Sequence, residues 1–129
     1  MPVTGRRVFL AGAAGGALIW LASPVVTGYR EPWDAPGPYF ALSLSGLGIM
    51  LGALAPRLFW LAPLAGFGGQ FVVFASRALL PPQELWLLGL IVLVIYAGII
   101  AVGALVGALG RVGGRRLQGW VRQRRLPAG

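Results

Sequence analysis

The stretch LWLLGLIVLVIYAGIIAVGALVGALG, residues 85–110, contains 26 consecutive residues without a charged side chain. At 1.5 Å per residue, a helix over this stretch is about 39 Å long, which exceeds the ~30 Å thickness of the hydrocarbon layer of a bilayer. We therefore predict a membrane-spanning helix here, long enough to tilt or to project beyond the bilayer.

Three shorter uncharged runs precede this stretch, and each is also long enough for a span. Even the shorter of them reach roughly 25–28 Å as helices. Short connections rich in proline and charge separate the runs, so they cannot continue the helices. The tight turn at Ala55-Pro56-Arg57 predicts that the second and third helices are antiparallel neighbours. The predicted helices cover residues 8–28, 39–55, 58–76 and 85–110.

The composition agrees with lipid as the solvent of this chain. Of its 129 residues, 57% are hydrophobic and only 11% are charged. A water-soluble domain of this size leaves a large fraction of its surface exposed, so it cannot hide that much apolar area. We predict an all-α, up-and-down bundle of four transmembrane helices. It forms a single transmembrane domain over residues 1–129, with a basic cytoplasmic tail over 111–129.

The arginines are distributed unevenly between the two sides of the predicted bundle. With the N-terminus in the cytoplasm, nine of the eleven arginines face the cytoplasm, and only Arg30 and Arg77 face outward. Positive residues concentrate on the cytoplasmic side of membrane proteins. We therefore predict that both termini are cytoplasmic and that the chain is a multi-pass protein of a bacterial inner membrane. The three carboxylates, Glu31, Asp34 and Glu84, then face outward.

The residues that are missing exclude several classes of chemistry. The sequence has no cysteine and no histidine, which excludes disulfides, iron–sulfur clusters, histidine-ligated haem and histidine-dependent catalytic triads. We expect no enzymatic activity, no cofactor and no metal site. No predicted span has an ionisable residue near its centre, which disfavours ion-coupled transport. Nucleic acid is not an expected partner, because a single tryptophan in the basic tail provides no platform for stacked bases.

Pairs of glycines four residues apart occur in three of the predicted helices. They are Gly12/Gly16, Gly48/Gly52 and Gly103/Gly107. Such pairs give a helix a flat strip on which another backbone packs closely. The strips serve either internal packing of the bundle or contact with a partner subunit or a second copy. For the partner contact, Gly103 and Gly107 are the candidate residues.

The third predicted helix contains residues that interrupt helices. Pro63 removes a backbone hydrogen bond, and Gly66, Gly68 and Gly69 follow closely. Gln70 then lies near mid-membrane, where its amide needs a partner. We predict either an interhelical hydrogen bond, with Tyr96, Ser43 or Ser45 as partner, or a broken helix that lines a solute or anion pathway. The candidate pathway residues are Gln70, Tyr96, Gly66 and Gly69.

Two polar segments remain as candidate contact sites. The connection Arg30–Pro38 concentrates Glu31, Trp33 and Asp34, which form either a recognition surface for a partner or an interfacial anchor. The basic tail is a candidate contact for anionic lipids. Its candidate residues are Arg115, Arg116, Trp120, Arg122, Arg124 and Arg125.

These observations favour a small inner-membrane protein without catalytic activity. We interpret the chain as an accessory, assembly or scaffold subunit of a larger membrane complex. The alternative is a homo-oligomeric channel or facilitator for a small solute or anion that uses the glycine-rich third helix. The expected partners are the lipid bilayer, anionic lipids at the tail, and other membrane subunits or further copies of this chain.

Overall fold

Four α-helices make up the described part of the chain. The computed structural model describes residues 3–78 and 85–124. The helices are α1 (Val3–Thr27), α2 (Tyr39–Leu54), α3 (Leu61–Ala78) and α4 (Trp86–Arg124), and a short 3-10 turn, η1 (Pro56–Leu58), joins α2 to α3. The predicted all-α class with four helices is confirmed.

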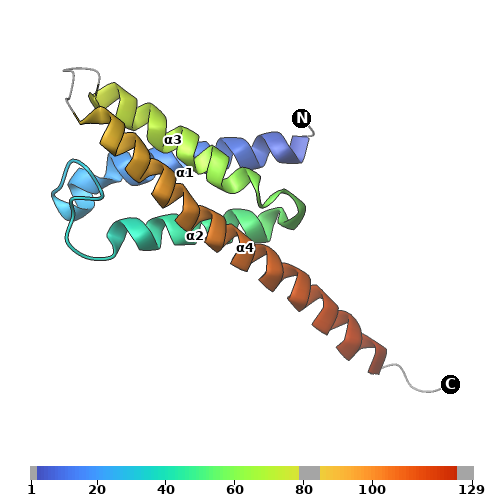
Figure 1. The fold of residues 1–129 in the computed structure, drawn as a ribbon. Coiled ribbons are helices and arrows are strands. Elements are labelled where there is room, and N and C mark those ends of the chain that lie inside the picture. Colours follow the sequence, from blue (N-terminus) through green and yellow to red (C-terminus); the bar gives the residue numbers. More distant parts are fainter. Residues whose placement is uncertain (1–2, 79–84, 125–129) are drawn as a thin grey trace.

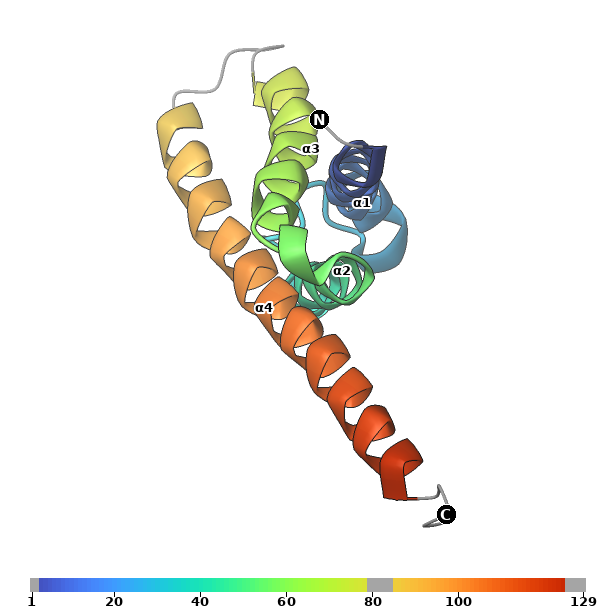
Figure 2. The same cartoon turned by 90° about the vertical axis from the view of Figure 1, so that its right-hand side faces the viewer.

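Consecutive helices run in opposite directions, so the bundle has two distinct ends (Figure 1). The connection 28–38, the end of α3 and the start of α4 lie at one end, here named the loop end. The start of α1 and η1 lie at the opposite end, here named the turn end. Helix α4 crosses the other three obliquely, and its C-terminal part projects beyond the turn end (Figure 2).

The helices pair in alternation along the chain, and the glycine strips make this possible. Helix α1 packs most extensively on α3, and α2 on α4. A Cβ atom added to Gly16 would lie 2.3 Å from the carbonyl oxygen of Gly66, and one added to Gly69 would lie 1.9 Å from that of Ala13. The backbones of α1 and α3 therefore touch, as expected for small-residue contacts.

The contact between α2 and α4 is built in the same way. A Cβ atom on Gly52 would lie 1.9 Å from the carbonyl oxygen of Ala104, and one on Gly107 would lie 2.1 Å from that of Ile49. As predicted, α2 and α3 are antiparallel and in contact. The turn η1 joins them, but each packs chiefly against another helix, because the glycine strips face α4 and α1.

Two helices extend further than predicted, and α3 is continuous. Helix α1 begins at Val3, and α4 continues through the predicted tail as far as Arg124. Each glycine in this part of α4, including the adjacent Gly113 and Gly114, costs the helix only about 1 kcal/mol, and the arginine, leucine and glutamine residues between them favour the helix. The broken helix, which was one of the two arrangements predicted for this segment, is wrong. Pro63 is the third residue of α3, where backbone N–H groups have no partner within the helix anyway.

Apolar side chains cover the outside of this bundle. Among the described residues, α1 and α4 are long and apolar enough to cross a membrane, and α2 is a shorter apolar helix. Only 28% and 22% of the apolar windows of α1 and α4 are buried within the chain. Val25 is 88% exposed, and Ile95 and Val102 are each 65% exposed. A core helix of a soluble protein buries such residues.

Candidate functional site

The connection at the loop end begins from a well-defined helix terminus. Gly28 has φ +79°, a conformation that favours glycine, and its N–H donates to the carbonyl of Pro24 at 3.2 Å. The buried hydroxyl of Ser23 donates to the carbonyl of Tyr29 at 2.9 Å, and the N–H of Tyr29 donates to Oγ1 of Thr27 at 3.1 Å. These bonds turn the chain back over the end of the bundle.

The connection then inserts Pro32 and Trp33 against the core. Pro32 is fully buried. The Trp33 ring lies edge-on to Trp20 and Phe74, with ring centroids 4.7 and 5.8 Å away. Such edge-to-face contacts add to the stabilisation from burial. Trp33, predicted as a recognition residue or an interfacial anchor, is thus partly buried, because α1, α2 and α3 all present aromatic rings to it.

Beneath this contact, a hydrogen bond joins α1 to α3. Both Trp20 and Gln70 are fully buried. Nε1 of Trp20 donates to Oε1 of Gln70 at 3.3 Å, and Nε2 of Gln70 donates to the carbonyl of Gly66 at 3.3 Å. Of the two predicted roles, this geometry corresponds to the interhelical hydrogen bond.

The predicted partners of Gln70 were wrong. Tyr96 packs its ring on Phe40 instead, with centroids 4.4 Å apart. The signal for the true partner was present in the sequence, because a tryptophan inside a helix needs an acceptor for its N–H. Trp20 offers a donor and Gln70 an acceptor, so their needs are complementary. Gly66 and Gly69, the other predicted pathway residues, lie in close backbone contacts between helices.

Arg77 ties the end of α3 to the connection. Its Nη1 atom donates a hydrogen bond to the carbonyl of Arg30. Its guanidinium carbon lies 5.7 Å from the centroid of the Trp20 ring, within the range of a cation–π contact. This arginine therefore helps to hold the connection over the bundle.

An open cleft at the loop end brings together the three predicted recognition residues. It has a volume of about 300 Å³ and is named here the acidic cleft. A turn in which the N–H of Asp34 donates to the carbonyl of Glu31 at 3.1 Å holds the two acidic residues close together. The cleft thus holds two carboxylates beside aromatic rings, and Arg77 of α3 lies near enough to interact with the charge of Glu31. The cleft is lined by Glu31, Trp33, Asp34, Phe74, Leu85, Leu88, Gly89 and Val92.

The other predicted contact residues lie along α4. Gly103 and Gly107 are buried against the backbone of α2 in the same chain. They therefore serve internal packing, the first of their two predicted roles, and are not free for a partner in this arrangement.

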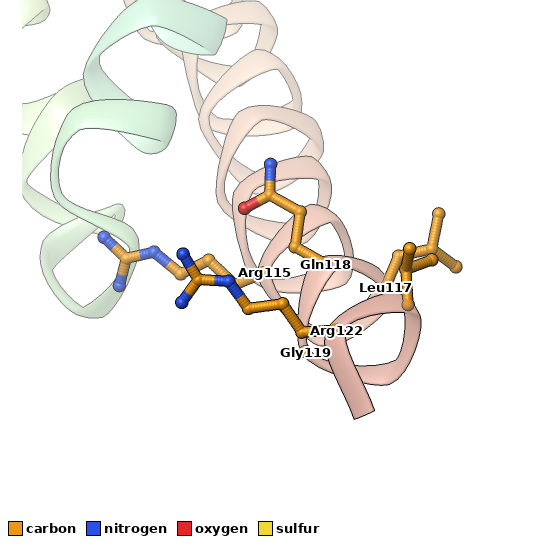
Figure 3. A pocket seen from close by; sticks show the side chains of 6 residues that line it. Arg115, Leu117, Gln118, Gly119 and Arg122 are labelled. Atoms are coloured by element: carbon orange, nitrogen blue, oxygen red, sulfur yellow. The ribbon is translucent and has the colours of Figure 1, made fainter. Parts of the chain in front are cut away.

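The described basic residues of the predicted tail lie on the exposed C-terminal part of α4. Arg115, Arg116, Trp120, Arg122 and Arg124 are all exposed, whereas Arg125 lies outside the described residues. The guanidinium carbon of Arg124 lies 3.6 Å from the centroid of the Trp120 ring. The side chains of Arg115 and Arg122 extend to the same side of α4, and Leu117 extends to another (Figure 3).

Comparison of the chain with protein-family models, curated proteins and solved structures found no match. The chemistry of its own surfaces is therefore the basis for a functional conclusion.

Proposed function

We propose that this chain is a four-span protein of a bacterial inner membrane, with both termini in the cytoplasm. It acts as a non-catalytic subunit that binds a neighbouring membrane subunit through the acidic cleft. The exposed apolar faces of α1 and α4 support the membrane placement, because lipid is the environment in which such faces are stable.

The position of the arginines supports the orientation. The described arginines outside the loop end are at the start of α1, in η1, and in the part of α4 after residue 110. Only Arg30 and Arg77 belong to the loop end. With the turn end in the cytoplasm, this pattern obeys the positive-inside rule.

Reporter fusions test this orientation. We expect a fusion after Gly129 to be active only as a cytoplasmic reporter, and one after Ala35 only as a periplasmic reporter. Activity in both formats at one site would contradict a single orientation.

The acidic cleft is the observation that carries the proposed subunit role. It combines Glu31 and Asp34 with Trp33, which the core already holds in place. A side chain fixed by packing loses little conformational freedom when a partner binds. The channel alternative depended on a broken third helix and a free Gln70. Since α3 is continuous and Gln70 is hydrogen-bonded, we do not propose it.

Two matched variants test docking at the cleft. Leu88→Trp fills the cleft, whereas Leu87→Trp adds the same bulk at a neighbouring exposed position outside the lining. We expect Leu88→Trp, and Glu31→Gln combined with Asp34→Asn, to reduce co-purification of membrane subunits under mild detergent. Leu87→Trp is expected to behave as wild type. If all three variants co-purify membrane subunits in the same amount as the wild type, docking at the cleft is refuted.

A further inference from the structure

The face of α4 that packs inside the bundle continues into arginines beyond it. Ile100, Ala104 and Gly107 are buried on this face. Residues three, four and seven apart share a helix face, so Arg111 and Arg115 continue the same row. Both are exposed, and Arg115 lines a groove with the end of α2 and with η1. The side of α4 that faces the other helices is therefore basic where it leaves them.

An open groove lies between this part of α4 and η1. It has a volume of about 900 Å³ and is named here the basic groove. Arg57 of η1 lines it together with Arg115 and Arg116 of α4. The remaining lining is mostly apolar, with Leu54, Ala55, Pro56, Leu58 and Val112 beside Thr4.

The charges of this groove are one-sided. Three arginines line it, and the acidic side chains of the sequence are at positions 31, 34 and 84. Glu31 and Asp34 belong to the opposite end of the bundle. Guanidinium groups donate paired hydrogen bonds that match the geometry of a phosphate, and a cluster of them attracts an anion strongly. The groove therefore lacks an anionic partner within the lining and favours one from outside.

We propose that the basic groove binds an anionic phospholipid. The phosphate lies between Arg57, Arg115 and Arg116, and an acyl chain follows the apolar wall that begins at Leu54 and Leu58. This inference rests on the proposed membrane placement, in which the turn end lies at the cytoplasmic headgroups. Basic pockets between helices at that level are suited to lipid headgroups. An apolar wall next to the arginines suits a lipid better than a free phosphate ion.

Lipid binding by the purified full chain in neutral detergent tests this proposal. Native mass spectrometry measures the retention of phosphatidylglycerol and of phosphatidylcholine with the same acyl chains. The groove variant is Arg57→Gln/Arg115→Gln/Arg116→Gln. The control variant is Arg111→Gln/Arg122→Gln/Arg124→Gln, which removes the same number of exposed charges outside the lining.

We expect wild type to prefer phosphatidylglycerol over phosphatidylcholine. The groove variant should lose on the order of a hundredfold in affinity for phosphatidylglycerol, given the contribution of each arginine near a lipid surface. The control variant should lose much less. Equal losses in the two variants would overturn the proposal, because binding would then follow total charge. Displacement of the lipid by an equal concentration of inorganic phosphate would overturn the assignment to a lipid.

This test is independent of the acidic cleft at the other end. Docking at the acidic cleft is measured by co-purification, and lipid binding at the basic groove by mass spectrometry. A negative result in one measurement therefore does not affect the other. Membrane insertion is measured separately, as resistance of the wild type and both triple variants to extraction by alkaline carbonate. Complete extraction of the wild type would refute the membrane placement itself, whereas normal insertion with equal lipid binding in both variants would refute only the basic groove.

Discussion

Replacing Gly107 with alanine tests whether backbone contact between α2 and α4 holds the bundle together. The added Cβ atom would lie 2.1 Å from the carbonyl oxygen of Ile49, and 3.0 Å is the practical lower limit for such contacts. The helices must therefore separate locally by about 0.9 Å. A gap of this size forfeits roughly a quarter to a half of the dispersion energy of the atom pairs concerned. Overpacked sites typically lose about 1–3 kcal/mol, which is the destabilisation that we expect.

The measurement is equilibrium unfolding in mixed micelles, followed by circular dichroism as the denaturing detergent is increased. Gly98→Ala is the matched control, because a Cβ atom at Gly98 meets nothing within 4 Å and alanine favours the helix by up to about 1 kcal/mol. Gly89 is unsuitable as a control, since its Cβ atom would lie 2.5 Å from the Phe74 ring. If Gly107→Ala is as stable as Gly98→Ala, close packing of α2 on α4 does not stabilise the protein.

Two further predictions concern the loop end. Trp20→Phe and Gln70→Leu each remove one partner of the 3.3 Å hydrogen bond, and a double-mutant cycle on unfolding should give a coupling of about 0.6 kcal/mol, the average for such bonds in membranes. Strictly additive effects would show that the bond contributes nothing. Arg77→Gln removes the donor to the Arg30 carbonyl, so trypsin should cleave after Arg30 faster than in wild type, while Arg57→Gln at the opposite end should leave this rate unchanged. Equal rates in all three proteins would mean that Arg77 does not hold the connection.

The existence of the four helices could be predicted from the sequence, but the start of α1 and the end of α4 could not. Uncharged runs of sufficient length, separated by prolines and arginines, restrict the chain to a few helices whatever their tertiary contacts. The choice of helix partners could not be predicted. A glycine pair such as Gly48/Gly52 indicates a close contact, but it carries no information on which of the other helices makes it.

The details of the candidate site were only partly predictable, for a related reason. The grouping of Glu31 and Asp34 follows from their closeness in sequence, and the acidic cleft contains both. Its remaining wall comes from α3 and α4, which lie far away in the sequence. The partial burial of Trp33 depends on Trp20 and Phe74, which belong to two different helices. The residues near position 33 therefore do not predict it.

The alternating pairing of the helices has a consequence for how the chain is made. A ribosome delivers α2 before its main partner α4, and about 50 residues separate Gly52 from Ala104, which it contacts. At roughly 5–20 residues per second, α2 waits for several seconds before that contact forms. During this interval the flat glycine face of α2 lacks its partner, and in the proposed membrane placement it is open to lipid. A chain that stops before α4 therefore exposes a helix face that the finished bundle covers.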